Sequence, residues 1–363
     1  MSIRNFALSV LALSAAAATQ AQSSYNVYGV IDLSVGSMQL SGLPTAADNK
    51  RLTKVDGNNM TTSFLGFKGV EDLGGGLKAG FTLEAFLRPD TGAQGRSDAN
   101  TTVTPNVPAD NFWGRAANVY LQSDLGKLTI GRQGNLLFGQ VASYNPFGGA
   151  FGLSPAVRLT FGRWSNDKGD SGWSNAITYS SPNLAGFTGS VSYQAGEDST
   201  LNERNSYALA ANYANGPFAV GGAWQTVRSA DAPKVNLTKG QRQNFGLVST
   251  SYDLGVAKLF GQYAEFSNSG YSGASRIDTQ LYQLGASIPV TKMSKVMVSY
   301  GESKEKPVQG GTTPVTKHRI TSVGYDLNLS KRTDVYAVVM VDKEQLANFE
   351  SGTSVVFGLR HAF

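Results

Sequence analysis

The chain has 363 residues, with 31 Lys and Arg against 26 Asp and Glu, a formal net charge of +5, and no cysteine. The absence of cysteine excludes disulfides, thiol chemistry and Cys-ligated metal sites. The small positive charge, without runs of like charge, argues against nucleic-acid binding.

The first residues, MSIRNFALSVLALSAAAATQAQSS, predict a secretory signal peptide. Arg4 precedes an uncharged stretch, and the small residues Thr19 and Ala21 fit a cleavage site. The apolar part is too short for a spanning anchor, which makes an uncleaved anchor the weaker alternative. We expect residues 1–21 to be removed, leaving residues 22–363 as a single exported domain.

From Tyr25 onward the chain alternates apolar and polar residues with the period of two that is typical of β-strands. In GLKAGFTLEAFLR the apolar residues share one face, and the other face carries Lys78, Glu84 and Arg88, which must meet water. Sixteen such segments follow in chain order: 25–36, 60–69, 77–88, 112–123, 127–133, 173–181, 187–196, 205–214, 218–229, 242–253, 256–266, 278–288, 295–304, 317–327, 333–343 and 353–363.

The connections between these segments alternate in length. Seven are short turns rich in Gly, Pro, Asn, Asp and Ser, such as EDLGGG and SDLG, and between them lie eight longer polar stretches. Outer-membrane barrels have short turns at one end and longer loops at the other. The sequence therefore predicts an all-β protein, a 16-stranded antiparallel transmembrane β-barrel.

Two other architectures fit parts of this pattern. An array of soluble β-sandwiches would also alternate, but no linker divides the chain into units of sandwich size. Residues 205–227 carry no formal charge and have the length of a membrane helix, but NYANGPF in their middle is a turn signal. Two strands explain that segment better.

The last segment, VVFGLRHAF, is a half-apolar strand that runs to Phe363 without a polar tail. In hydrocarbon each unpaired backbone N–H or C=O costs several kcal/mol, so a membrane sheet must close on itself. We therefore expect the strand at 353–363 to pair with the strand at 25–36.

Motifs that carry chemistry are missing from the sequence. Only His318 and His361 are present, and no G-x-S-x-G, H-E-x-x-H or G-x-x-x-x-G-K pattern occurs. We expect no enzymatic activity, no cofactor and no metal site. The alternative from the enzyme class is an outer-membrane barrel hydrolase, which would need a Ser, a His and an orienting group clustered on the outer wall.

Five stretches resemble the trimeric general diffusion porins of Gram-negative outer membranes, particularly the anion-preferring porins of beta-proteobacteria. They are YGVIDLSVG, SFLGFKGVEDLGGGLKAGFTLE, NVYLQSDLGKLTIGRQ, NAITYSSPNLAGF and GLRHAF, in the family's order. The resemblance implies a homotrimer in the cell outer membrane, surrounded by its lipid and lipopolysaccharide, with a third loop folded into the lumen to narrow the pore.

That third loop would run from about Gly134 to Gly172. Its NPFGGAF is similar to a loop-tip motif that carries a glutamate in cation-preferring relatives, and here the glutamate is missing. Up to Asn166 the loop has no acidic residue, yet it contains Arg158 and Arg163. The resemblance therefore implies a basic narrowing.

The family also sets arginines on the wall opposite the loop. Arg115 in GRAANVYL and Arg132 in IGRQ match two such positions, whereas Phe64 and Gly172 stand where two others would fall. The size of the basic cluster is therefore open, and Arg158 and Arg163 could compensate for the missing charges.

From the alternation we expect Glu84 to line the lumen on the same face as Lys78 and Arg88, and to set a transverse field with Arg115. Each basic residue has a plainer alternative. Arg88 lies near a strand end and fits a solvated rim charge, and Arg132 could anchor the third loop through backbone carbonyls. The direction of Arg115 is open, because Ala117 and the apolar residues beyond it share its strand face.

These residues predict a water-filled channel for passive diffusion of small hydrophilic solutes and ions. Because salt screens charges over about 8 Å, a few arginines should favour anions without excluding cations. The alternative among channels is a pore with a dedicated site for one anion, such as a dicarboxylate or phosphate.

Overall fold

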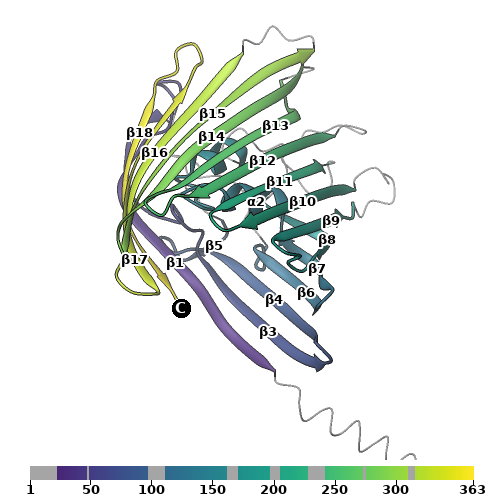
Figure 1. Ribbon diagram of the computed structural model, residues 1–363. Helices are drawn as coiled ribbons and strands as arrows, with labels where there is room; N and C mark the ends of the chain where they lie inside the picture. The colour runs from purple at the N-terminus through teal and green to yellow at the C-terminus, as the bar shows by residue number, and fades with distance from the viewer. Residues whose placement is uncertain are drawn as a thin grey trace, which may run out of the picture.

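The computed structural model describes residues 23–46, 49–96, 111–161, 171–196, 205–227, 242–272, 275–309 and 315–363, without the side chains of 268–272, 275–277 and 307–309. Its strands form one antiparallel sheet that curves round into a barrel (Figure 1). The predicted signal peptide, residues 1–21, lies outside this description, so its cleavage stays a prediction.

The sheet has 18 strands in the described part of the chain. Sixteen long strands make the wall: β1 (Ser24–Met38), β3 (Phe64–Gly74), β4 (Leu77–Arg88), β6 (Ala116–Ser123), β7 (Gly126–Gly134), β8 (Gly172–Ser180), β9 (Phe187–Gln194), β10 (Ser206–Asn215), β11 (Phe218–Val227), β12 (Gln243–Asp253), β13 (Lys258–Ser272), β14 (Ser275–Thr291), β15 (Ser294–Gln309), β16 (Thr316–Asn328), β17 (Thr333–Glu344) and β18 (Gly352–Ala362). The predicted 16-stranded antiparallel barrel is confirmed. The two further strands are β2 (Leu52–Gly57), paired with β1, and β5 (Ala93–Gln94), paired with β4.

The barrel closes between its first and last strands, as the sequence predicts. The register of β1 against β18 runs from Val30 opposite Ala362 to Ser37 opposite Val355. At the end of this seam, Gly29 and Phe363 exchange two backbone hydrogen bonds of 3.2 and 3.1 Å. The terminal strand therefore completes the wall.

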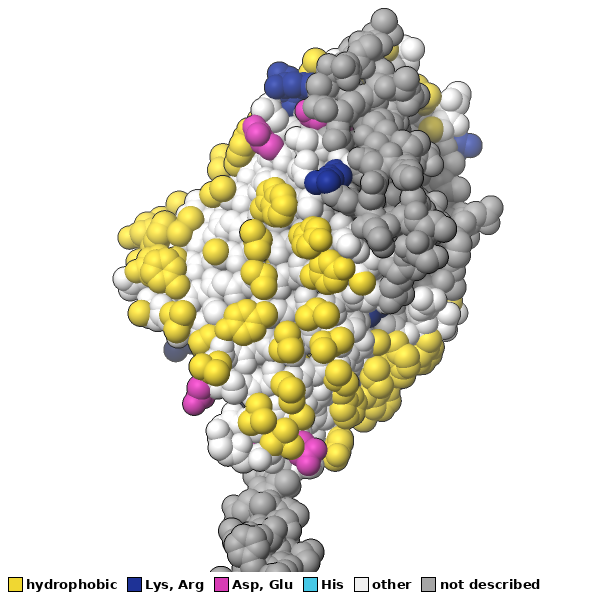
Figure 2. All heavy atoms as spheres, turned by 90° about the vertical axis from the view of Figure 1, so that its right-hand side faces the viewer, with side chains coloured by type: hydrophobic (Ala, Val, Ile, Leu, Met, Phe, Trp, Pro, Cys, Tyr) yellow, Lys and Arg dark blue, Asp and Glu magenta, His cyan; other side chains and the backbone are white. Residues whose placement is uncertain are grey.

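The outer face of the wall is apolar across its middle. Figure 2 shows hydrophobic side chains spread over the wall, with charged side chains near its upper and lower margins. Every second residue of a strand points outward, so Leu209, Trp224, Val248 and Leu284 are 42–62 % exposed. This belt is the surface that faces lipid in a transmembrane barrel. No helix in the described ranges is long and apolar enough to cross a membrane.

The second long strand of the wall, β3, begins at Phe64, four residues later than the strand expected at 60–69. Here β2 and β3 follow one another along β1, and the residues between them, 58–63, leave the wall and are mostly buried. Asn58 has a φ of 72°, a left-handed conformation that asparagine tolerates better than most residues. The strand pattern stops there because this segment makes its hydrogen bonds elsewhere.

Those hydrogen bonds centre on Asp32, a lumen-side residue of β1 that is fully buried. Its carboxylate accepts from the backbone N–H groups of Met60 at 2.8 Å and Thr61 at 2.7 Å. It also accepts from the hydroxyl of Tyr336 on β17 at 2.7 Å. Asp32 therefore joins the inward segment to the strands on both sides of the seam.

Candidate pore constriction

We call the connection between β7 and β8, residues 135–171, the third loop, and its described stretch 135–161 folds along the inside of the barrel. It contains α2 (Leu136–Ser143) and α3 (Pro155–Phe161). The helix α2 packs against β10–β12, and α3 packs against β14–β16. The loop therefore occupies the inner face of one half of the wall, as the resemblance implies.

The local sequence explains how this loop folds. Asn135 caps α2 by accepting a hydrogen bond from the N–H of Phe138 at 2.7 Å. Asn145 organises the following turn, because its side chain accepts from the N–H of Phe147 at 2.9 Å and from the hydroxyl of Ser154 at 3.0 Å. Apolar side chains then fill the space between the loop and the wall: Leu137, Val141, Leu153, Ala156 and Val157.

Side chains of the wall bind the loop's backbone. The side-chain amide of Gln262 on β13 donates to the carbonyls of Val141 at 3.0 Å and Tyr144 at 2.8 Å. The hydroxyl of Ser322 on β16 donates to the carbonyl of Leu153 at 2.7 Å. Without these bonds the carbonyls of Tyr144 and Leu153 would lose a donor, which would destabilise the loop.

Two further contacts fix the distance between loop and wall. The hydroxyl of Tyr144 donates to Asn212 on β10 at 3.1 Å, and burial raises the pKa of Tyr144, so this group stays protonated. On β15, Gly301 has no side chain where α3 approaches, and a Cβ there would lie 2.8 Å from Leu159. The loop is therefore seated closely against its half of the wall.

Across the lumen from the loop, Glu84 and Arg115 form an ion pair. The Arg115 Nε lies 2.8 Å from a Glu84 carboxylate oxygen, and their side chains are 35 % and 14 % exposed. The other carboxylate oxygen of Glu84 accepts from the hydroxyl of Tyr28 on β1 at 2.6 Å. Glu84 lies on the inner face of β4, as the alternation predicts.

The direction of Arg115, which the sequence leaves open, is inward. Arg115 precedes β6, so it does not follow the parity that points Val119 outward. Its guanidinium lies 4.2 Å from the ring centre of Phe64, a cation–π contact. Phe64 thus holds Arg115 in place.

Arg132 holds the segment that carries Arg115. Its guanidinium donates to the backbone carbonyl of Gly114 and, at 2.8 Å, to the hydroxyl of Ser174 on β8. Arg132 therefore braces the residue next to Arg115. Gly114 belongs to the segment before β6, so the carbonyl that Arg132 binds is not one of the third loop.

The other two residues expected with Glu84 lie toward the ends of β4. Lys78 is exposed at the short-turn end, opposite Gln122 of β6 in the register. Arg88 lies at the long-loop end, where its Nε donates to the carbonyl of Arg96 at 2.8 Å. The position of Arg88 agrees with the rim alternative.

Two further lysines of the inner wall were not among the residues that the sequence predicts to line the pore. The ammonium of Lys68 lies 4.5 Å from the ring centre of Tyr28, and that of Lys127 lies 3.8 Å from the ring centre of Tyr120. In GKLTIG the apolar Leu128 and Ile130 face outward, so alternation alone could have placed Lys127 inside.

The two arginines of the third loop, Arg158 and Arg163, were both predicted to line the pore. Arg158 is 6 % exposed and lies behind the loop, where its guanidinium is 3.5 Å from the Asp342 carboxylate and donates to the carbonyl of Gly152 at 3.2 Å. This placement differs from the pore-lining position that we expected, because Asp342 on β17 draws the side chain toward the wall. Arg163 lies outside the described residues.

The described residues contain no group of three or more His, Cys, Asp or Glu that could hold a metal ion. His318 bonds to Asp342 at 2.7 Å, and His361 bonds to Thr333 at 2.9 Å. The His318 contact belongs to the network that holds Arg158.

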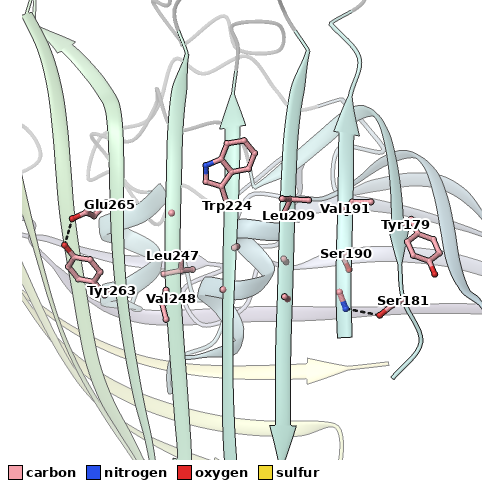
Figure 3. Close-up of a pocket in the computed structure, with 16 residues that line it drawn as sticks. Tyr179, Ser181, Ser190, Val191, Leu209, Trp224, Leu247, Val248, Tyr263 and Glu265 are labelled. Atoms are coloured by element: carbon pink, nitrogen blue, oxygen red, sulfur yellow. Dashed lines mark hydrogen bonds between the residues drawn. The ribbon is translucent and has the colours of Figure 1, made fainter. Parts of the chain in front are cut away.

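The outer wall has a hollow of about 840 Å³ across β8–β13 (Figure 3). Small residues, including Ala211, Gly222 and Gly246, form its floor between larger apolar side chains such as Trp224. A 2.5 Å hydrogen bond from Tyr263 to Glu265 lies at one side. The hollow belongs to the lipid-facing belt, and the ion pair of Glu84 and Arg115 lies on the inner face of other strands.

Comparison with known proteins agrees with this architecture. The sequence profile of the Gram-negative porin family matches residues 7–345. The chain is 32 % identical to outer membrane porin protein 32 of Delftia acidovorans, with 98 % of each chain covered, and 26 % identical to an outer membrane porin of Bordetella pertussis, with 96 % of each covered. Among solved structures, the anion-selective porin from Comamonas acidovorans has a TM-score of 0.74 and 27 % identity, over 94 % of this chain and 100 % of that one. The chain therefore belongs to the Gram-negative porin family, and it is a diffusion channel of the outer membrane and not an enzyme.

Proposed function

We propose that this porin prefers anions, passes small anionic or polar solutes without a dedicated substrate site, and assembles as a homotrimer among outer-membrane lipid and lipopolysaccharide. The observation that carries the preference is the uneven placement of the third loop. Because its helices pack on β10–β12 and β14–β16, they leave the inner face of β3–β7 exposed to solutes in the open part of the lumen.

That inner face carries more cations than anions. The inward-facing charged residues of these strands, as far as the structure describes them, are Lys68, Lys78, Arg88, Arg115 and Lys127 against Asp72 and Glu84. Unit charges about 4 Å apart interact by about 1 kcal/mol in water and by more beside low-dielectric walls. This excess should concentrate anions several-fold in the narrow part. The anion selectivity named for the Comamonas acidovorans porin supports the same preference.

The test is the reversal potential of the purified channel in a planar bilayer under a KCl gradient. We expect the sign that corresponds to chloride permeating faster than potassium. The opposite sign, which means that potassium permeates faster than chloride, would refute the anion preference.

Single-channel recordings with chloride, malate and phosphate separate a general pore from a dedicated one. We expect conductance to rise in proportion to concentration for all three anions. Saturation with one anion at low concentration would indicate a dedicated site for that anion.

A further inference from the structure

The outer face of β15–β17 becomes strongly basic toward the long-loop end of the barrel. The exposed belt ends there with Val323, Val339 and Val341, which are 46, 44 and 42 % exposed. Beyond it, on the same outward face, lie four cations that we call the rim patch: Lys304, Lys317, Arg319 and Lys343.

The register places these cations in two like-charged pairs. Lys304 of β15 is directly opposite Lys317 of β16, and Arg319 of β16 is directly opposite Lys343 of β17. Directly opposite residues have Cβ atoms about 4.5–5.5 Å apart, and like charges in such positions destabilise a sheet. Two adjoining pairs of this kind favour an anion bound between them.

One carboxylate compensates part of the patch. Glu302 lies 2.5 Å from the Arg319 Nε and 3.7 Å from the Lys317 ammonium. Neither Lys304 nor Lys343 has a carboxylate within ion-pair distance in the described part of the chain. The patch therefore keeps an excess of positive charge.

Two other acids on the outward face near the rim patch lie on the neighbouring strands β13 and β14. Glu265 on β13 accepts hydrogen bonds from Tyr263 and, at 3.1 Å, from Gln280. Asp278 on β14 is opposite Lys306 in the register, and the Lys306 ammonium donates to Gln280 at 2.9 Å. Glu265 and Lys306 therefore both bond to Gln280, and Asp278 lies opposite Lys306 in the register, on the β13–β14 side of the rim patch.

We infer that the rim patch binds the phosphate group of a phosphorylated lipid in the outer leaflet. Charged side chains immediately beyond the apolar belt of a barrel lie at the level of the lipid headgroups, where each cation adds to the attraction for anionic lipid. A lipid fits better than free phosphate because the exposed valines continue from the patch along the same strands, where acyl chains would cover them. The inference gives the lipid contact of the proposed function a specific site.

The experiment is native mass spectrometry of the full-length channel in detergent, titrated with bisphosphorylated lipid A, with its dephosphorylated form and with inorganic phosphate. The test variant is Lys304→Gln/Lys343→Gln, which removes one member of each like-charged pair. The matched control is Lys292→Gln/Lys331→Gln, which removes two exposed lysines from the turns at the opposite end of the same strands.

We expect the test variant to bind lipid A about tenfold more weakly than the wild type, and the control variant to bind it equally well. We also expect no difference between wild type and test variant with the dephosphorylated lipid. Equal loss in both variants, or binding that does not depend on the lipid's phosphates, would overturn the inference. Displacement of lipid A by low concentrations of inorganic phosphate would replace it with a free-phosphate site.

A second measurement remains informative if one variant folds poorly. Without phosphorylated lipid, Lys304→Gln/Lys343→Gln should be at least as heat-stable as the wild type, because both like-charged pairs are relieved. Added lipid A should raise the unfolding temperature of the wild type more than that of the variant. An equal rise in both would contradict the inference. Because the rim patch faces outward, the reversal potential should not change, so the lipid site and the anion preference can fail separately.

Discussion

At the scale of single residues, the pore-side charges are held in place by their neighbours. Arg115 lies over the ring of Phe64 and forms an ion pair with Glu84, while the hydroxyl of Tyr28 donates to the other oxygen of the same carboxylate. A guanidinium fixed in this way keeps one position as ions pass, so its field acts in a constant direction. The ion pair also means that Glu84 offsets part of the positive charge.

The two partners should therefore shift ion preference in opposite directions. Arg115→Gln leaves Glu84 uncompensated and should reduce the chloride-to-potassium permeability ratio by about two- to fivefold, while Glu84→Gln should raise it by a similar factor. The reversal potential in a salt gradient measures both. A shift of the same sign in the two variants would contradict a role of their charges at the narrowing.

The sequence predicts the inner position of Glu84 because its strand alternates cleanly. It leaves Arg115 open, because the residue precedes β6 and its direction depends on Glu84 and Phe64, which come from other strands. The pairing of Arg158 with Asp342 was unpredictable for the same reason. Charge patterns within a loop do not show which wall residue will meet them.

At the scale of elements, the third loop depends on a few polar contacts with the wall. Gln262 donates to the carbonyl of Tyr144 and to that of Val141, which also accepts from Asn145 at 2.7 Å. Buried carbonyls that lose a donor cost about 1–3 kcal/mol each. This part of the channel is therefore sensitive to substitutions that leave the strands intact.

Gln262→Leu should loosen the loop and leave the barrel folded. We expect larger current fluctuations and a higher mean conductance in single-channel recordings. Gln283→Leu is the control, because Gln283 is another fully buried glutamine of the wall that donates to Ser299 of the neighbouring strand. Equally quiet currents in wild type and Gln262→Leu would show that these bonds do not hold the loop.

The sequence identifies the strands well where one face meets lipid and the other meets water. The strand expected at 60–69 overlaps β3 from Phe64 onward but begins too early, because residues 58–63 are mostly polar and mostly buried. Their partners are Asp32 and, through Asp32, Tyr336, which are distant along the chain. A pattern read over neighbouring residues contains no information about such contacts.

At the scale of the whole molecule, closure depends on more than the backbone ladder between β1 and β18. Asp32 of β1 lies opposite Arg360 of β18 and accepts a hydrogen bond from Tyr336 of β17. Arg360 in turn bonds to Asp334 at 3.0 Å and to Thr61 at 2.7 Å. The seam is therefore also joined by side chains on its inner face.

Asp32→Ala should weaken the whole barrel. The two backbone donors and the Tyr336 hydroxyl would lose their acceptor, which costs about 3 kcal/mol or more in total. Denaturant unfolding followed by tryptophan fluorescence measures the loss. Asp253→Ala is the control, since within the described ranges that carboxylate accepts only from the N–H of Gly255, in an exposed turn. Equal stability of the two variants would contradict the role of Asp32.

The one-sided seating of the third loop has a consequence for how such a channel can be altered. Its bore depends on the contacts of the loop with β10–β17, whereas its electrical character depends on side chains of β3–β7. The two properties therefore belong to separate sets of residues. Size exclusion and ionic discrimination can then be retuned one at a time, by natural variation or by an engineer building a nanopore.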